Sequence, residues 1–400
     1  MPHPLPTPPQ TPPQVSGDWH GVMTGFHPHG EVPGNATHRP VLRRVLLTGV
    51  VVTIFGLAAL VMGAIVVDSL GLTTAALAML TASLAIGIVV PTFLWVDRLE
   101  GEPARLLWFA FLWGALISTL GALLLSATGM QFVAGLHEDP LVVGAVVVAP
   151  VTEELLKGLG VGLIFWRARR EFDGVVDGIV YAGLVAAGFA FVENILYLGT
   201  AYAEAGPAGL VGLFIVRGLV SPFAHPMFTV CVGLAFGLIA HRRRWSSAWA
   251  VLVGLAAAVF LHALFNYSAV AAADAYLLLF GLVQVPLFVA FLLLLRWARR
   301  REARLVRDHL TGYGVNGWFT PAEVAMLADG GGERRRARRW ARQVGGRRAE
   351  RAMTAFQDES GELAMVRKHL NAVGPDPERL RRERVLLATV AEHRRVFVGS

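Results

Sequence analysis

Eight apolar stretches, each long enough to cross a lipid bilayer, dominate this sequence of 400 residues. A helix needs about 20 apolar residues to span a hydrocarbon core of roughly 30 Å. The composition agrees, since 54% of the residues are hydrophobic, 16% are charged and the mean hydropathy is +0.54. These values exclude a soluble globule and predict an all-α, polytopic membrane helix bundle. We place its eight transmembrane helices at residues 45–67, 73–96, 105–128, 141–165, 175–199, 209–240, 249–270 and 276–295.

The chain divides into three predicted regions. Residues 1–40 contain ten of the 21 prolines and few apolar residues, so we expect a disordered cytoplasmic tail. Residues 41–298 contain the eight membrane helices. Residues 299–400 are polar and basic, and they include two helix-start signals, Thr320-Pro321-Ala322-Glu323 and Asp376-Pro377-Glu378. We therefore expect a small helical cytoplasmic domain at the end of the chain.

The distribution of arginine predicts how the bundle is oriented. Arginines follow or precede the helices on one side, at positions 43–44, 98, 105, 167–170, 242–244 and from 296 onward, whereas the opposite loops lack Lys and Arg. This asymmetry places both termini in the cytoplasm of a plasma membrane. The basic run at residues 334–342 would then lie beside the anionic inner leaflet, and attraction to that surface explains it more simply than binding of nucleic acid.

Ionisable residues occur at membrane depth in four of the predicted helices. Because a charge in hydrocarbon is costly, such residues normally face the bundle interior and mark a functional site. In the fourth helix, Lys157 follows Glu153 by four residues and Glu154 by three, so its ammonium can reach either carboxylate. One glutamate would suffice for a buried ion pair, so the second suggests a base or a ligand. Pro150 just before them can kink the helix.

The remaining polar positions lie on the next three helices. Glu193 stands beside Asn194 in the fifth, His225 lies between two prolines in the sixth, and His262 precedes Asn266 by four residues in the seventh. Counting residues along each helix puts these groups within about two turns of the same depth. Two neutral imidazoles and a carboxylate are a common catalytic zinc set, and a further glutamate can deprotonate the bound water. The constellation therefore predicts hydrolysis of a peptide bond inside the membrane.

At these residues the chain resembles the PrsW-type intramembrane proteases, distant relatives of the type II CAAX prenyl proteases. The resemblance extends roughly over residues 90–295. The matching motifs are Glu153-Glu154-x-x-Lys157, Phe189-x-x-x-Glu193-Asn194, His225 and His262-x-x-x-Asn266, supported by Asp97-Arg98-Leu99-Glu100-Gly101-Glu102-Pro103 and Asp177-Gly178-Ile179-Val180-Tyr181.

The resemblance implies a catalytic set of Glu153, Glu154, Lys157, Glu193, His225, His262 and Asn266. Within it, Glu153 and Glu154 include the catalytic base, and Glu193, His225 and His262 are candidate ligands of a metal, Zn²⁺ by the chemistry above. A mechanism without metal, in which glutamate and histidine activate water directly, stays open. The implied substrate is a single-pass membrane protein, such as an anti-sigma factor, cut near its extracytoplasmic face.

Two other classes of function also bury carboxylates and histidines. An ion-coupled transporter usually shows internal repeats, and none is detectable here. A non-catalytic multipass scaffold would not need the full glutamate and histidine set. The sequence thus favours an intramembrane endopeptidase, with the scaffold and the transporter as alternatives.

Overall fold

The computed structural model describes residues 39–99, 101–135, 139–169, 172, 174–240, 246–270, 276–329, 331–374 and 376–398. Helices account for almost all of these residues, and no strand occurs among them, which confirms the predicted all-α class. The predicted tail of residues 1–40 lies outside the described residues up to position 38. So do several loop residues used for the predicted orientation, namely His137, Asp274 and residues 242–244.

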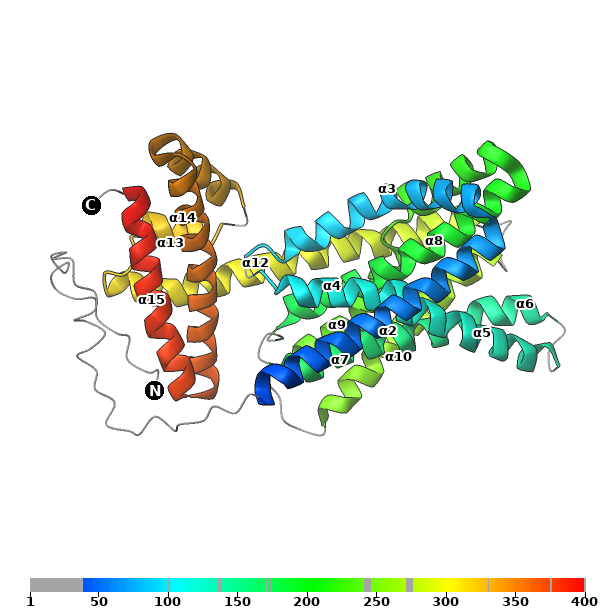
Figure 1. The fold of residues 1–400 in the computed structure, drawn as a ribbon, viewed down its shortest axis with the longest axis horizontal. Coiled ribbons are helices and arrows are strands. Elements are labelled where there is room, and N and C mark those ends of the chain that lie inside the picture. Colours follow the sequence, from blue (N-terminus) through cyan, green and yellow to red (C-terminus); the bar gives the residue numbers. More distant parts are fainter. Residues whose placement is uncertain are drawn as a thin grey trace. The chain divides into compact units, whose positions relative to one another are not determined.

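Two compact units make up the chain (Figure 1). One is Phe55–Arg304, and the other joins the described residues 39–54 to the described residues from 305 to 398. The elements are α2 (Arg39–Leu70), α3 (Leu72–Val96), α4 (Ala104–Leu112), η1 (Trp113–Ser118), α5 (Thr119–Ala134), α6 (Pro140–Val143), η2 (Gly144–Val148), α7 (Ala149–Arg167), α8 (Val175–Phe214), η3 (Ile215–Val220), α9 (Ala224–Ile239), α10 (Ser246–Val270), α11 (Tyr276–Leu279), η5 (Phe280–Gln284), α12 (Val285–Val315), α13 (Pro321–Leu327), α14 (Gly332–Val373) and α15 (Pro377–Val398).

Six helices in the described part of the chain are long and apolar enough to cross a membrane, against the eight that the sequence predicts. The difference has two sources. Helix α7 carries Glu153, Glu154 and Lys157, so its composition is too polar to qualify. The fifth and sixth predicted helices fall in one helical run, Val175–Ile239, which is interrupted at Gly206, where φ is +63°. All eight predicted segments are therefore largely helical, within a polytopic membrane bundle.

Helix α8 is the centre of the first unit. Between Val175 and Gly199 it is buried on nearly all sides, as expected for a helix that is apolar all round. It packs against α3, α4, α7 and α9 (Figure 1). Glycine makes this close packing possible, because a Cβ atom added to Gly178 of α8 would lie 2.1 Å from the carbonyl oxygen of Gly233 in α9. The two backbones thus touch just where the helices cross.

The end of α12 and helices α13, α14 and α15 form a core of their own in the second unit, around residues such as Leu310, Phe356 and Leu387. The predicted capping box is present, since Thr320 Oγ1 accepts the Glu323 N–H and the Glu323 carboxylate accepts the Thr320 N–H. The second predicted start is confirmed as well, because α15 begins at Pro377.

The α8–α9 crossing generates a test of the fold. Gly178→Ala should lower the free energy of unfolding by about 3 kcal/mol, the upper end of the usual cost of overpacking, because backbone and not a flexible side chain opposes the new methyl group. Unfolding in mixed micelles measures this change. Gly87→Ala on α3 is the matched control, since nothing lies within 4 Å of its added Cβ. Equal stability of the two variants would contradict the close contact.

Candidate functional site

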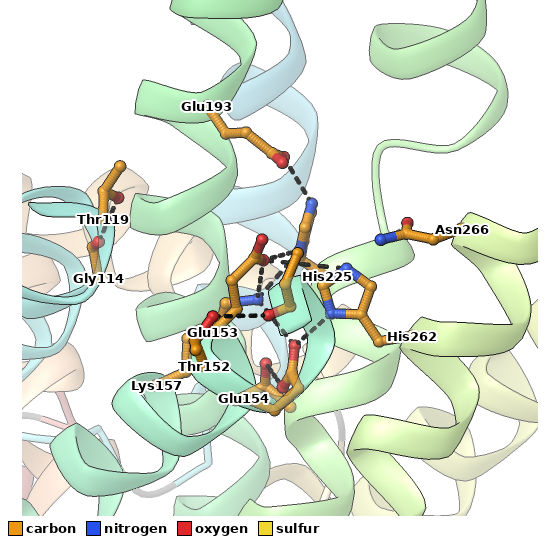
Figure 2. Close-up of polar contacts among 12 residues, drawn as sticks. Gly114, Thr119, Thr152, Glu153, Glu154, Lys157, Glu193, His225, His262 and Asn266 are labelled. Atoms are coloured by element: carbon orange, nitrogen blue, oxygen red, sulfur yellow. Dashed lines mark hydrogen bonds and ion pairs between the residues drawn. The ribbon is translucent and has the colours of Figure 1, made fainter. Parts of the chain in front are cut away.

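Four helices of the first unit bring the predicted site residues together. Helix α7 carries Glu153, Glu154 and Lys157, and it starts after the π-helical turn η2, with Pro150 in its first turn. Helices α8, α9 and α10 carry Glu193, His225 and His262. Figure 2 shows these side chains converging from different helices, with Glu193 reaching His225 from one side. Residues separated by more than 100 positions thus form one cluster.

Lys157 lies at the middle of the cluster and is completely buried. Its Nζ donates to Glu154 Oε1 at 2.7 Å and to Glu153 Oε2 at 3.3 Å, as the i, i+3 and i, i+4 spacings predict. A third contact joins Nζ to His225 Nδ1 at 3.1 Å. The ammonium also lies 4.0 Å from the centroid of the Phe189 ring. All three of its protons therefore have acceptors.

Glu154 is also fully buried, and both of its oxygens are bonded. Besides Lys157, Oε1 accepts from His262 Nδ1 at 3.0 Å, while Oε2 accepts from Thr229 Oγ1 at 2.8 Å. Sequence reasoning missed Thr229. The signal was present, since Thr229 follows His225 by four residues and so shares its helix face. With these bonds Glu154 is held in place as a fixed negative charge.

The hydrogen bonds assign a tautomer to each histidine. An ammonium can only donate, so His225 Nδ1 accepts from Lys157, and His225 Nε2–H donates to the Glu193 carboxylate at 2.7 Å. His262 Nδ1–H donates to Glu154, which leaves the lone pair of His262 Nε2 unprotonated. Each imidazole is therefore oriented by a carboxylate through one nitrogen and presents the other nitrogen to the centre of the cluster.

Glu193 has a second partner besides His225, on the side away from the cluster. Its Oε2 forms an ion pair with Arg217 Nη2, and Arg217 Nε donates to Asn194 Oδ1 at 2.7 Å. The guanidinium lies 4.3 Å from the centroid of the Tyr197 ring. Arg217, which belongs to the π-helical turn η3, was not among the predicted site residues. It holds Glu193 against His225.

Glu153 differs from the other two glutamates. The same Oε2 that meets Lys157 lies 3.8 Å from His262 Nε2 and 4.0 Å from His225 Nδ1. Glu153, His225 and His262 are all buried, and one ligand atom from each lies within 4.8 Å of the others, so they can hold a metal ion. The predicted ligand set contained Glu193 in place of Glu153. In the structure Glu193 touches His225 at the nitrogen that faces away from this group.

Asn266 lies at the edge of the cluster (Figure 2). Its Nδ2 donates to the backbone oxygen of Ala145 at 2.8 Å, within the turn η2 that leads into α7. The shared helix face with His262 is as predicted, but the amide ties α10 to η2 and forms no hydrogen bond with the described side chains at the centre of the cluster. Its contact is with the backbone that positions Glu153 and Glu154.

Loss of the central ammonium should destabilise the protein. Lys157→Ala leaves two buried carboxylates without their countercharge, which typically costs about 3 to 5 kcal/mol. The melting temperature in detergent should fall accordingly. Leu159→Ala, at an exposed position on the same helix, is the control and should melt close to the unchanged protein. A Lys157→Ala variant that melts like the control would refute the role of the ion pairs.

Comparison with known proteins agrees with this geometry. Residues 102–295 match the family described as PrsW family intramembrane metalloprotease. Protease PrsW of Geobacillus kaustophilus is 30% identical over 195 residues, covering 47% of this chain and 78% of the relative. Protease PrsW of Oceanobacillus iheyensis is 27% identical over 163 residues, covering 41% and 66%, and that of Clostridioides difficile is 33% identical over 138 residues, covering 34% and 55%. No solved structure matches the chain.

The matched region contains the whole buried cluster, from Glu153 on α7 to Asn266 on α10. It also contains three of the six helical runs of the described chain that are apolar enough to cross a membrane, and the start of a fourth, in agreement with an integral membrane protein. The chain belongs to the PrsW family of intramembrane proteases.

Proposed function

We propose that this protein hydrolyses a peptide bond of a membrane-anchored protein, with Glu153 activating the attacking water. One observation supports this most strongly. Two imidazoles, each oriented by a carboxylate behind it, present unprotonated nitrogens toward a third carboxylate, that of Glu153, in a buried site. Such a set of acceptors is suited to holding a water by its protons and to removing one of them.

A divalent metal fits the donor set of this site. His225, His262 and Glu153 match the two histidines and one carboxylate that hold many catalytic zinc ions. Because His225 Nδ1 accepts from Lys157 in this structure, a metal would take that lone pair in place of the lysine N–H. Glu193 and Glu154 then serve as the outer carboxylates that orient ligating imidazoles. Charge is consistent with a cation here, because three carboxyl groups come together and their ion pairs with full cations in the described part of the chain are those with Lys157 and Arg217.

Zn²⁺ held by these residues would lower the pKa of a bound water to about 7 and polarise the scissile carbonyl. The side chains divide the remaining work. Glu153 Oε1, which makes no hydrogen bond to the described residues, takes the proton of the water and passes it to the leaving amine. Glu154 and Glu193 keep the histidines in their tautomers. Lys157 contacts His225 and Glu153 and balances the charge of the glutamates around it.

The proposed substrate is a single-pass membrane protein such as an anti-sigma factor. The chain's own orientation supports a cut near the extracytoplasmic face, since the arginine distribution predicts both termini in the cytoplasm of a bacterial plasma membrane. In that orientation Glu193 and His262 lie toward the outer half of the bilayer. The basic residues of the last 100 positions would then meet the anionic inner leaflet.

Metal content tests the proposed ligands. Purified protein should contain about one zinc ion per chain by elemental mass spectrometry, and His225→Ala/His262→Ala should contain none, because two of three ligands are gone. Glu153→Gln should also lose metal, whereas Glu193→Gln should retain most of it. The reverse order would restore Glu193 to the ligand set. Unchanged protein that is free of metal but still cleaves would refute the metal.

A second test distinguishes the role of Glu153 from that of Glu154. Glu153→Gln should reduce cleavage of a co-expressed single-pass reporter at least 100-fold, the usual contribution of a general base. It should lower the melting temperature less than Glu154→Gln does, because Lys157 lies 3.3 Å from Glu153 and 2.7 Å from Glu154. Glu154→Gln should lower both the cleavage of the reporter and the melting temperature, since it weakens the closest contact of Lys157. Full activity of Glu153→Gln would remove that residue from the chemistry.

A further inference from the structure

A small pocket lies beside the catalytic cluster and is not used by the mechanism above. Its volume is about 120 Å³, and its walls come from the end of η3, the start of α9, α10, η5 and the start of α12. The walls are apolar, with Ala224, Met227, Phe265 and Phe288 among them. A dry cavity of about 150 Å³ accommodates a benzene molecule, so this space fits one medium-sized apolar side chain.

One polar group in this pocket lacks a partner. Gln284 is only 4% exposed, and its Oε1 forms no hydrogen bond with any described residue. The other polar residue of the wall is already engaged, since Ser221 Oγ donates to the backbone oxygen of Val216 at 2.8 Å. A buried, unpaired amide oxygen is costly, and such groups in native proteins commonly mark a functional site or the position of an ordered water. Gln284 therefore offers an acceptor inside an apolar space.

The pocket adjoins the catalytic histidines. Ala224 immediately precedes His225 on α9, and Phe265 follows His262 by three residues on α10. The Phe228 ring stacks on His262 with centroids 5.0 Å apart and lies 5.8 Å from Phe265. The pocket wall is therefore in contact with the residues that pack directly against the catalytic histidines.

Two π-helical turns border the pocket. Turn η3 ends at Val220, and turn η5 ends at Gln284. Such turns are rare and occur frequently at functional sites, because they change the direction in which the following side chains point. Val220 and Val285 belong to the wall of the pocket and are 47% and 44% exposed. Both lie in helical runs that are apolar enough to cross a membrane, so a segment within the bilayer can reach this part of the wall.

We propose that this pocket binds an apolar substrate side chain next to the scissile bond, while Gln284 Oε1 accepts an N–H from the substrate backbone. This inference rests on the proposed peptidase function. A transmembrane substrate must unwind locally to be cut, and unwinding frees backbone N–H groups that hydrocarbon cannot satisfy. The Gln284 acceptor inside the pocket would stabilise that unwound segment, and the volume of the pocket would select leucine-sized or methionine-sized residues.

Cleavage of a library of apolar peptides by the detergent-purified full chain tests this proposal. The products, sequenced by mass spectrometry, should show Leu or Met enriched at one position beside the cleaved bond. Ala224→Leu fills the pocket and should shift that preference to Ala and Gly. Met227→Ala enlarges it and should shift the preference to Phe and Trp. The two variants act in opposite directions, so a general loss of folding cannot produce the pattern.

Gln284→Met preserves size but removes the acceptor, and it should raise KM at least 10-fold with little change in the preferred side chain. The matched control is Gln131→Met, the same substitution at an exposed position of α5, and it should behave like the unchanged protein. Cleavage with the same preference in the unchanged protein and both pocket variants would overturn the pocket proposal alone. No cleavage by the unchanged protein would instead overturn the peptidase function, and this inference with it.

Discussion

The structure of this site depends on the burial of one ammonium among three carboxylates. Lys157 has no exposed surface, so its charge must be balanced by protein groups. Its ammonium donates to two carboxylates on its own helix, those of Glu153 and Glu154, and to the imidazole of His225 on α9. This third contact joins α7 to α9. The tautomer of His225 follows from it. The same lysine thus links the packing of the bundle to the protonation of the residues that would carry the chemistry.

Much of the site follows from spacing in the sequence. The contacts of Lys157 with Glu153 and Glu154 are those expected three and four residues apart on a helix, and the convergence of Glu193, His225 and His262 was expected from their common depth. Spacing along one helix cannot determine which of several acids faces a histidine on another helix. For this reason the predicted ligand set contained Glu193, whereas in the structure Glu153 lies closest to the two unprotonated imidazole nitrogens. The ion pair with Arg217 accounts for the position of Glu193 on the other side of His225.

The fold, like the site, was predictable from the sequence in its main features but not in its local irregularities. Apolar length predicted every helical segment of the membrane region, and helix-start signals predicted α13 and α15. The π-helical turns η2, η3 and η5 were not predicted, because a single extra residue per turn leaves almost no trace in an apolar sequence. These turns nevertheless direct Arg217 and Gln284 to their positions. Local irregularities that sequence patterns do not reveal therefore determine much of the detail around the site.

The glycine contact between α8 and α9 has a consequence for movement. Backbones that touch at Gly178 and Gly233 cannot slide past each other without a steric clash, so the pair that carries Glu193 and His225 behaves as one rigid body. Helix α12 meets α9 through larger rings, such as Phe288 against Phe223, whose side chains can change rotamer. If the bundle opens to admit a substrate, we therefore expect α12 to move and the α8–α9 pair to stay fixed. The catalytic groups on α8 and α9 would then keep their geometry during that movement.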